Sequence, residues 1–401
     1  HSFPTRRSSD LRPMIETSTR ALLQRLVAFD TTSRRSNLRL VEAVEDWLER
    51  HGVTSRRVYD PSGTKANFFA TIGPARDDGV ILSGHVDTVP VEDQAWSGDP
   101  FQLREDGDRL LGRGTADMKG FVAVALAKVP AMARAPLQRP IHLALSYDEE
   151  VGCLGVRTLL ERLQGEGFRA AGCVVGEPTG MAVVLGHKGK HSVEVEVVGA
   201  ECHSALAPHG VNAVEYAARL VTKISDIGRR LAQEGPFDAA YEVPHSTAHV
   251  GALHGGTALN IVPDACRFAF ELRHLAAQPA EPLLEEIEAF ARGELEPAMR
   301  AVHQEAGIRF RRTSRVPGFE LPAEHAFARS VAELAGHGVA GKAAYSTEAG
   351  LFAEWLGVAS VVCGPGDIAQ AHKPDEFVEA GQLAACERFV DRLIDTCTRP
   401  A

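Results

Sequence analysis

The sequence predicts an α/β protein in which one domain is inserted into another. Short apolar runs alternate with helical periods from Met14 onward, the order changes between residues 188 and 315, and the alternation then resumes. A chain of 401 residues is also long for a single hydrophobic core, which favours two domains. We therefore expect a first domain from residues 14–187 and 316–401, with residues 188–315 inserted.

The first domain is expected to hold buried strands covered by helices. A helix is predicted over residues 36–52, because Ser36 or Asn37 can cap its start, an apolar stripe follows, and Gly52 can end it. Short apolar runs bounded by turn residues predict buried strands. These runs are ANFFATIG (66–73), GVILSGH (79–85), IHLALSY (141–147) and GCVVGEP (172–178). After the insertion we expect a helix at 324–336, a strand at 359–366 and a closing helix from Gly381.

The inserted segment has its own order of elements. Its patterns predict strands at 191–199, 246–253, 265–273 and 308–314, with helices at 211–231 and from residue 282. This β-α-β-β-α-β order is that of a ferredoxin-like unit with an antiparallel sheet.

Composition excludes several classes of function. The formal net charge of -10 argues against nucleic-acid partners and against attraction to anionic membranes. No apolar run approaches membrane-spanning length, and no signal peptide opens the chain. The seven cysteines are scattered and make no C-x-x-C pair, which is typical of reduced thiols. We therefore expect a cytoplasmic protein.

Residues 1–13 lack a starting Met and a hydrophobic period, and we interpret them as non-native sequence or a disordered arm.

Histidine and acidic residues follow the predicted strands. In open α/β sheets functional residues gather at the carboxyl ends of strands. Taken singly, such residues are usually solvated or satisfied by neighbours. Two imidazoles and three carboxylates at successive strand ends instead form a mixed ligand set suited to zinc, cobalt or manganese, with room for two ions if one carboxylate bridges. The candidates are His85, Asp117, Glu150, Glu177 and His372.

Two further acidic positions have specific hypotheses. Asp87 lies two residues after His85 and can accept a hydrogen bond from its ring, although capping the turn before Pro90 is an alternative. Glu149 and Glu150 are adjacent, so in an extended segment they point apart and have separate tasks, unless both are plain surface charges. Asp148 has no assigned chemistry, and a structural role in the turn is its default.

The motifs GHVDTVP, GRGTADMKG, DEEVGCLG, GEPT and AHKPDE resemble those of the dizinc deacetylase and aminoacylase family of metallopeptidases. The resemblance runs from about Met14 to the end of the chain. It implies a mixed-sheet catalytic domain of zinc-aminopeptidase type and an inserted lid or dimerisation domain. It also implies a homodimer formed through the inserted domain, and a peptide bond between Asp117 and Met118 that the family often holds cis.

The resemblance assigns roles to the candidate ligands. His85, Asp117 and Glu177 would hold one side of a zinc pair, with Asp117 bridging, while Glu150 and His372 complete it. Glu149 matches the general base. The implied reaction is hydrolysis of the amide bond of an N-acyl amino acid, with N-acetylornithine as the favoured substrate. N-succinyl-diaminopimelate and other N-acyl amino acids are alternatives within the family.

Six residues elsewhere are implied to complete the site. His203 would stabilise the oxyanion in a neighbouring subunit, and Asn260 and Arg273 would contact the substrate, Arg273 through its α-carboxylate. Gly364 and Gly366 offer backbone N–H groups to a carboxylate, and Glu348 offers an anion to a cationic substrate tail. Each also has a plain structural alternative. His203 would lie in a polar loop, Asn260 and the two glycines would be turn residues, and Arg273 would be a surface charge. Glu348 would be a carboxylate in the first turn of a helix.

Two other functions remain as alternatives. A non-catalytic metal-containing binding protein would have lost the base or a ligand. Here the base Glu149 and all five candidate ligands are in place. A nucleophile at Cys202 beside His203 is disfavoured, because adjacent residues in an extended segment point apart.

Overall fold

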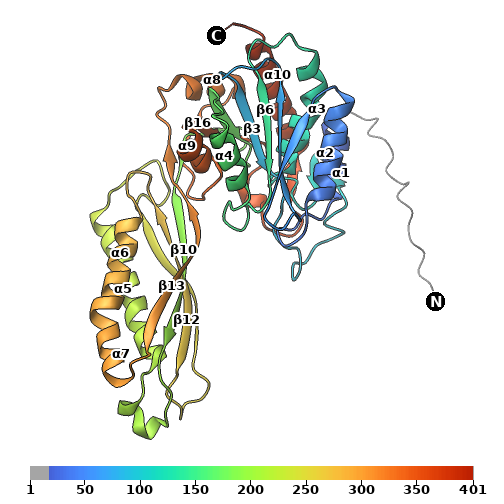
Figure 1. Ribbon diagram of the computed structural model, residues 1–401. Coiled ribbons are helices and arrows are strands. Elements are labelled where there is room, and N and C mark those ends of the chain that lie inside the picture. Colours follow the sequence, from blue (N-terminus) through green and yellow to red (C-terminus); the bar gives the residue numbers. More distant parts are fainter. Residues whose placement is uncertain (1–17, 401) are drawn as a thin grey trace, which may run out of the picture.

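The larger part of the molecule, which we call the body, is built on a mixed eight-stranded sheet (Figure 1). The computed structural model describes residues 18–400, so the prediction for residues 1–13 lies outside the described residues. In spatial order the strands are β1 (Ser55–Tyr59), β2 (Ala66–Ile72), β6 (Ile141–Ser146), β3 (Val80–His85), β7 (Gly172–Val175), β16 (Ala359–Val362), β8 (Val183–Val184) and β15 (Val339–Ala340). The central strands β6, β3, β7 and β16 run parallel, and β1 and β2 are antiparallel to their neighbours.

Helices cover both faces of this sheet. One face carries α1 (Thr19–Val27), α2 (Leu38–Arg50), α3 (Lys119–Arg134), α8 (Ala326–Ala335) and α10 (Ala380–Cys397). The other face carries α4 (Val156–Gly165) and α9 (Ala349–Leu356). Because both faces are covered, every side chain of β3 and of β6 is buried, as the apolar runs predicted.

Smaller pieces surround the edge of the sheet where the central strands end. A three-stranded sheet joins β4 (Arg104–Asp106), β5 (Arg109–Leu111) and β17 (Phe377–Glu379), and a two-stranded one joins β9 (Gly186–His187) and β14 (Phe319–Glu320). A short 3₁₀ turn, η3 (Ile368–Gln370), precedes His372. The pairing of β5 with β17 brings together two segments that lie more than 250 residues apart in the sequence.

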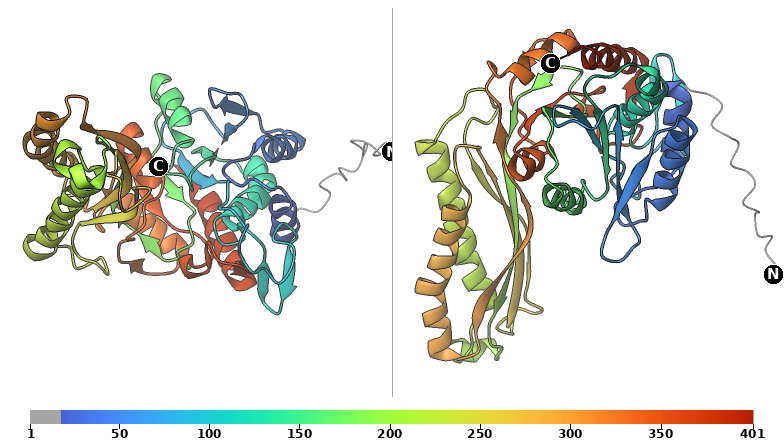
Figure 2. Two further views of the ribbon diagram at one scale, coloured as in Figure 1. Left: turned by 90° about the horizontal axis from the view of Figure 1, so that it is seen from below. Right: turned by 45° about the horizontal axis from the view of Figure 1, so that its top comes forward.

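The inserted elements form an elongated unit that projects from the body, which we call the arm (residues 189–316; Figure 2). Its antiparallel sheet has the order β11 (Thr247–Gly255), β12 (Ala265–His274), β10 (Gly189–Val198) and β13 (Gly307–Val316). One face packs on α5 (Ala213–Glu234), α6 (Glu281–Phe290) and α7 (Glu296–Val302), with a π-helical turn, η2 (Ala291–Leu295), between the last two. A 3₁₀ turn, η1 (Ser204–His209), lies between β10 and α5.

The observed elements confirm the predicted fold class: an α/β body with a mixed sheet, and a separate antiparallel sheet in the β-α-β-β-α-β order. Asn37 is the N-cap residue of α2, but its side chain makes no capping hydrogen bond. Leu38 N–H donates to Ser36 Oγ at 3.3 Å, whereas the Asn37 amide pairs with the backbone of Ala66 at 2.8 and 3.0 Å.

Two further observations bear on the sequence analysis. The peptide bond between Asp117 and Met118 is cis, as the resemblance implied. All seven cysteines lie among the described residues, and each has a free thiol. Between residues 18 and 400, none of the helices combines the length and apolar character needed to cross a membrane.

Candidate metal centre

The candidate ligands meet at one edge of the body sheet. Strands β6, β3 and β7 are parallel neighbours, so their carboxyl ends lie side by side. His85 is the last residue of β3, Glu149 and Glu150 follow β6, and Glu177 follows β7. The predicted strand over 172–178 ends early, at Val175, so that Glu177 lies in the turn beyond it.

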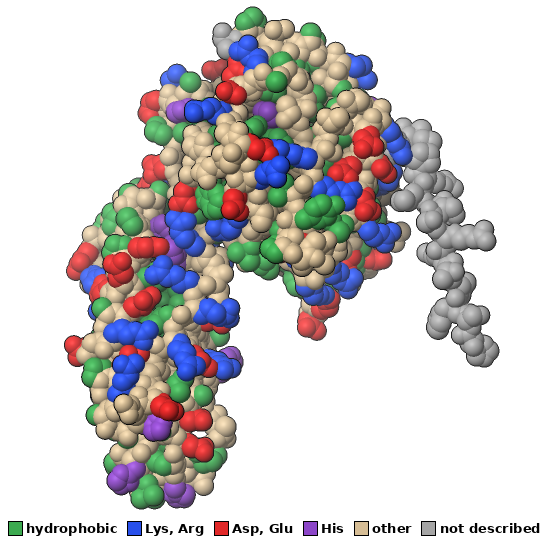
Figure 3. Space-filling model, viewed as in Figure 1, with side chains coloured by type: hydrophobic (Ala, Val, Ile, Leu, Met, Phe, Trp, Pro, Cys, Tyr) green, Lys and Arg blue, Asp and Glu red, His purple; other side chains and the backbone are tan. Residues whose placement is uncertain are grey.

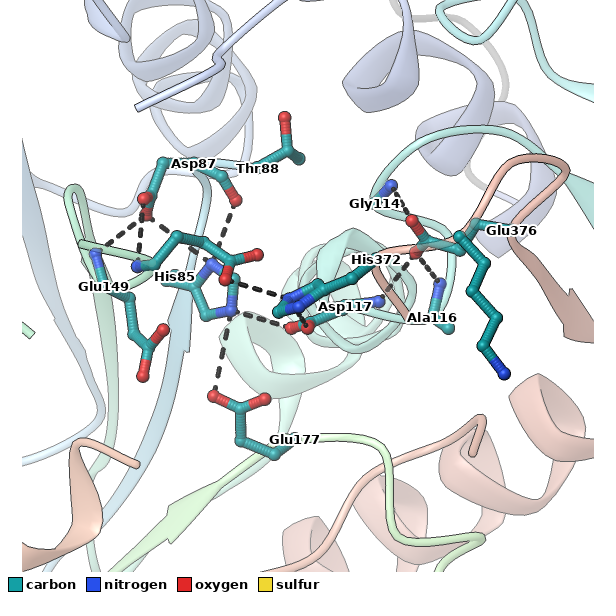
Figure 4. A network of polar contacts seen from close by, with 12 residues as sticks. His85, Asp87, Thr88, Gly114, Ala116, Asp117, Glu149, Glu177, His372 and Glu376 are labelled. Carbon is teal, nitrogen blue, oxygen red and sulfur yellow. Dashed lines mark hydrogen bonds and ion pairs between the residues drawn. The ribbon is translucent and has the colours of Figure 1, made fainter. Parts of the chain in front are cut away.

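Asp117 lies between the two histidines (Figure 4). Its Oδ1 is 2.9 Å from His85 Nε2, and its Oδ2 is 3.2 Å from His372 Nε2. His85 Nε2 is also 3.7 Å from Glu177 Oε1, and His372 Nε2 is 3.0 Å from Glu150 Oε2. A carboxylate with one oxygen toward each imidazole has the arrangement of a bridging ligand, and the partners on its two sides are those that the resemblance implied.

His85 is held so that its Nε2 faces the cluster. Its Nδ1 lies 3.0 Å from the backbone oxygen of Asp87 and 3.5 Å from the carboxylate of the same residue. If Nδ1 donates to that oxygen, the neutral ring has Nε2 free as a metal ligand. Asp87 therefore orients His85 mainly through its main chain.

The Asp87 carboxylate has a second task that the sequence did not suggest. It accepts hydrogen bonds from the backbone N–H of Glu149 at 3.1 Å and of Glu150 at 3.3 Å, and from Ser33 Oγ at 2.7 Å. Asp87 is buried, with 2% of its surface exposed. It therefore fixes the backbone of both adjacent glutamates. Glu150 points toward His372, and Glu149 lies beside His85.

The cluster concentrates negative charge in a buried place. Burial, and then the nearby Asp117, raise the pKa of Glu150 to about 7 and that of Glu177 well above its usual value. Burial also raises the pKa of Glu149 to about 8, with Glu150 and Glu348 adding to the effect. For Asp117 burial opposes ionisation, but hydrogen bonds from His372 and His85 lower its pKa overall. The raised pKa values favour the neutral forms of Glu149, Glu150 and Glu177 in the metal-free protein, and divalent cations placed among them would favour the ionised forms.

The spacing of donor atoms fits metal ions. One atom each of His85, Asp117 and Glu150 lies within 4.8 Å of the others, and the same holds for His85, Glu149 and Glu177. Glu150 Oε1 is buried without a hydrogen-bond partner among residues 18–400, as expected of an unsaturated ligand atom. Glu149 also falls within ligand spacing of His85 and Glu177.

Metal binding is expected to release protons. Hydrogen bonds to Asp117 and Glu150 raise the pKa of His372 to about 10, and the pKa of His85 is also raised despite its burial, through Asp117 and Asp87. These shifts favour the protonated form of both rings in the metal-free protein, whereas a metal ligand must be neutral. We expect protons to leave the imidazoles and the carboxyl groups with raised pKa when zinc binds, and zinc affinity to rise with pH through the neutral range.

Calorimetric titration of zinc into metal-free protein, in two buffers with different ionisation enthalpies, measures this proton release. An apparent binding enthalpy that is the same in both buffers would contradict the expectation.

A pocket opens over the cluster and is closed on one side by the arm. Arg273 and Lys190 are register partners on β12 and β10, at the end of the arm nearest the body. The pocket is lined by Asp117, Glu149, Glu150, Glu177 and His372 with Tyr345, Ser346 and Ile368 from the body, and by Lys190 and Arg273 from the arm. Arg273 Nε donates to Glu271 at 3.0 Å, which holds the guanidinium in this region. Of the implied substrate contacts, Arg273 is thus next to the metal cluster.

Three other implied substrate contacts are not among the residues that line the pocket. Glu348 precedes α9, is fully buried, and accepts a hydrogen bond from Ser83 at 3.4 Å. Gly364 N–H donates to Thr179 Oγ1 at 3.2 Å, and Gly366 O accepts from Gly180 N–H at 2.7 Å. A Cβ at Gly364 would lie 2.0 Å from the oxygen of Gly176, so this glycine allows close packing against the turn that carries Glu177.

His203 and Asn260 lie together at the far end of the arm. His203 follows β10 and Asn260 follows β11, and Ser204 N–H donates to the Asn260 oxygen at 3.0 Å. The ten residues of β10 span roughly 30 Å at about 3.3 Å per residue. Lys190 at the near end of β10 lines the pocket, so these two residues are about one strand length from the metal cluster of their own chain.

Several residues with clear structural tasks were not identified from the sequence. Glu376 and Arg113 form a buried ion pair at 2.7 Å beside Asp117. Both residues belong to motifs that carry the resemblance, but neither was given a role there. Asp148 is paired with Lys65 at 2.5 Å, which gives it the structural role in the turn that was its default. In the sequence, the positions of Arg113 close to Asp117 and of Glu376 close to His372 could have indicated a role in holding these candidate ligands.

The sequence of the chain matches those of known proteins. A family model described as peptidase family M20/M25/M40 matches residues 81–396. The chain is 37% identical over 383 residues to an acetylornithine deacetylase from Myxococcus xanthus, covering 94% of this chain and 96% of that protein. It is 31% identical over 393 residues to an acetylornithine deacetylase from Klebsiella pneumoniae, covering 96% and 98% of the two chains.

Solved structures show the same fold. An M20 family metallo-carboxypeptidase from Sulfolobus solfataricus matches with a TM-score of 0.74 and 16% identity, covering 95% of this chain and 99% of that chain. A tripeptidase from Staphylococcus aureus matches with a TM-score of 0.70 and 18% identity, covering 95% and 98%. The resemblance drawn from the motifs is confirmed, and the chain is a metallo-hydrolase that belongs to peptidase family M20/M25/M40.

Proposed function

We propose that the chain hydrolyses the amide bond of an N-acyl amino acid at a centre of two divalent ions, with N-acetylornithine as substrate and zinc as metal. The observation that carries the proposal is the Asp117 carboxylate, which has one oxygen 2.9 Å from His85 and the other 3.2 Å from His372. The preference for N-acetylornithine rests on the names of the curated relatives, and the arginine-biosynthetic reaction it implies gives ornithine and acetate.

The donor set fits two divalent ions. His85, Asp117 and Glu177 would hold one, and Asp117, Glu150 and His372 the other, with Asp117 shared. Nitrogen and carboxylate donors of this kind suit zinc, and also cobalt or manganese. When bound, the ions would polarise the amide carbonyl and acidify a water molecule.

Glu149 is proposed as the general base and acid. Its pKa of about 8 in the metal-free protein comes from burial and from neighbouring carboxylates, and added cations favour its ionised form. An ionised Glu149 takes a proton from the attacking water and then gives it to the leaving amine. The fixed backbone beneath it, held by Asp87, keeps the carboxylate within reach of both.

Arg273 is proposed to bind the α-carboxylate of the substrate. A guanidinium matches a carboxylate in geometry, and Arg273 lines the same pocket as the candidate metal ligands. Lys190, its neighbour across the strands, adds positive charge to the same wall. The arm would in this way act as a lid that orients the substrate over the ions.

We further propose that the arm joins two protomers and that His203 and Asn260 serve the centre of the partner. At the free end of the arm, Leu206, Leu259 and Ile261 are exposed, with Leu259 fully so. Hydrophobic and histidine side chains are visible at this end in Figure 3. Exposed apolar side chains on an ordered loop are typical of an interface. His203 Nδ1 accepts from Ala205 N–H at 3.1 Å, so the neutral ring has Nε2–H free to donate to an oxyanion.

Complementation between two inactive variants tests this sharing of residues. His203→Ala and Glu149→Gln are each expected to lose most of the activity. After the two are unfolded or dissociated and reassembled together, about a quarter of the sites should combine an intact Glu149 with an intact His203. Activity in the mixture should therefore rise to about a quarter of the wild-type value. A mixture no more active than its components would contradict the shared site.

A hydrolysis screen tests the proposed reaction. Metal-free protein is reloaded with zinc and compared on N-acetylornithine, N-succinyl-diaminopimelate and uncharged N-acetyl amino acids such as N-acetylmethionine. We expect the highest kcat/KM on N-acetylornithine, and no turnover without metal. A preference for the succinyl or the uncharged substrate would overturn the assignment of N-acetylornithine, and no amide hydrolysis at all would favour a non-catalytic binding protein.

The setting we propose for this reaction is the cytoplasm, as expected from the sequence. The seven free thiols suit a reducing compartment.

A further inference from the structure

A network of buried hydrogen bonds lies directly behind Asp117 and has no part in the chemistry described so far. Strands β5 and β17 pair antiparallel, with Phe377 opposite Leu111. This pairing brings the turn at 112–117, which ends in Asp117, against the segment 372–376, which begins with His372. The two segments carry two of the ligands proposed for one ion.

Glu376 occupies the junction between the two segments. Its side chain is buried, with 1% of the residue exposed. Its Oε1 accepts from the backbone N–H of Ala116 at 2.9 Å and of Asp117 at 3.0 Å, and its Oε2 accepts from Gly114 N–H at 3.0 Å (Figure 4). Three N–H groups of one turn therefore converge on a single carboxylate, as in an anion-binding nest.

Arg113 extends the network to His372. Its Nη1 donates to Glu376 Oε2 at 2.7 Å and its Nη2 to Gln94 Oε1. Gln94 Nε2 in turn donates to the backbone oxygen of His372 at 3.0 Å. This support matters because the His372 side chain is 52% exposed, whereas the other ligand side chains are nearly buried. Packing alone holds His372 less firmly than it holds the others.

We infer that Glu376 is a positioning residue of the metal centre: its carboxylate sets the distance between Asp117 and His372 and thereby the affinity for the ion that these two residues share. The inference rests on the proposed two-ion centre. Groups that orient metal ligands from behind commonly affect metal affinity by about 10- to 100-fold when they are changed. The effect is expected to be larger for this ion, because the other ion has only Asp117 in this network, whereas His85 ends β3 and Glu177 lies in the turn after β7.

The test is calorimetric titration of zinc, and separately of cobalt, into metal-free wild-type protein and its Glu376→Gln variant. The amide keeps the shape of the side chain but has one oxygen acceptor, so it cannot satisfy both pairs of donors. Wild type should bind two ions per chain. Glu376→Gln should bind the ion at His372 about 10- to 100-fold more weakly, and the other ion with a much smaller loss.

Glu296→Gln is the matched control. Glu296 is a buried carboxylate of the arm that accepts from Ile308 N–H at 3.0 Å and pairs with Arg300 at 2.8 Å, so its loss also removes buried hydrogen bonds. It should lower the melting temperature without changing the affinity for either ion.

Gln94→Leu provides a second variant at a partly exposed position, in case Glu376→Gln fails to fold. It removes the bond to the His372 backbone and should weaken the same ion by a smaller factor.

The outcomes separate the inference from the proposed function. Wild-type affinity for both ions in a folded Glu376→Gln protein, or in Gln94→Leu where the first does not fold, overturns the inference and leaves the two-ion centre in place. Equal losses in Glu376→Gln and Glu296→Gln would also overturn it, because they would indicate a general effect of stability. If wild-type protein binds neither zinc nor cobalt, the inference and the proposed function fail together.

Discussion

Replacement of Glu149 by Gln is expected to lower kcat by about 10²- to 10⁴-fold while both metal ions stay bound. The glutamine keeps the size of the side chain and the contact region near Cys153, whose Sγ is 3.2 Å from Glu149 Oε1. It cannot accept a proton from the attacking water, so only the proton-transfer function is removed. Steady-state kinetics together with metal analysis of the same preparation measure both effects.

Asp148→Asn is the matched control for that variant. It neutralises the adjacent carboxylate, which is paired with Lys65 at 2.5 Å and has a structural role in the turn. We expect a modest loss of stability and nearly unchanged kcat. If Glu149→Gln keeps near-wild-type turnover, Glu149 is not the base. If it loses an ion, Glu149 is a ligand, as its spacing from His85 and Glu177 also allows.

Asp117→Asn should have the largest effect on the metal centre. The carboxylate places an anionic oxygen near each imidazole, at 2.9 and 3.2 Å. An amide has one neutral oxygen and would turn an NH₂ group toward the second ion, so it cannot bridge. We expect activity to fall below detection and bound zinc to fall from two ions per chain to one or fewer, measured by metal analysis after gel filtration.

His372→Ala is the informative comparison, because His372 belongs to one ion only. This variant should retain one tightly bound ion, which distinguishes loss of a bridging ligand from loss of an ordinary one. Two ions retained by Asp117→Asn would contradict the bridging role.

The strands of the body were predictable because they are buried on both faces. β3 and β6 are buried along their whole length, and the short, mainly apolar runs between turn residues in their sequences are typical of such strands. Helix α3 was not predicted, because its sequence KGFVAVALAKVPAMAR is apolar nearly all round and contains Pro130, so it lacks a helical stripe. Its burial between the sheet and the helices α1 and α10 explains that composition.

The gathering of the candidate ligands was predictable from the sequence, whereas the groups that hold them were not. Each ligand follows a strand or stands in a motif with a recognisable pattern. Glu376 lies in the run HKPDEF, which reads as an exposed charged loop, and becomes buried only because β17 pairs with β5. Asp87 was expected to act on His85, but its hydrogen bonds to the backbone of Glu149 and Glu150 depend on the packing of β3 beside β6. Contacts of this kind follow from the tertiary fold, not from local pattern.

The central claim is that this chain is an amidohydrolase whose activity depends on two ions held by His85, Asp117, Glu150, Glu177 and His372. The most direct measurement is the release of free amine from N-acetylornithine as zinc is added stepwise to metal-free protein. Activity should rise with added zinc and reach its plateau at two bound ions per chain. Full activity without metal, or no release of amine at any zinc loading, would contradict the claim.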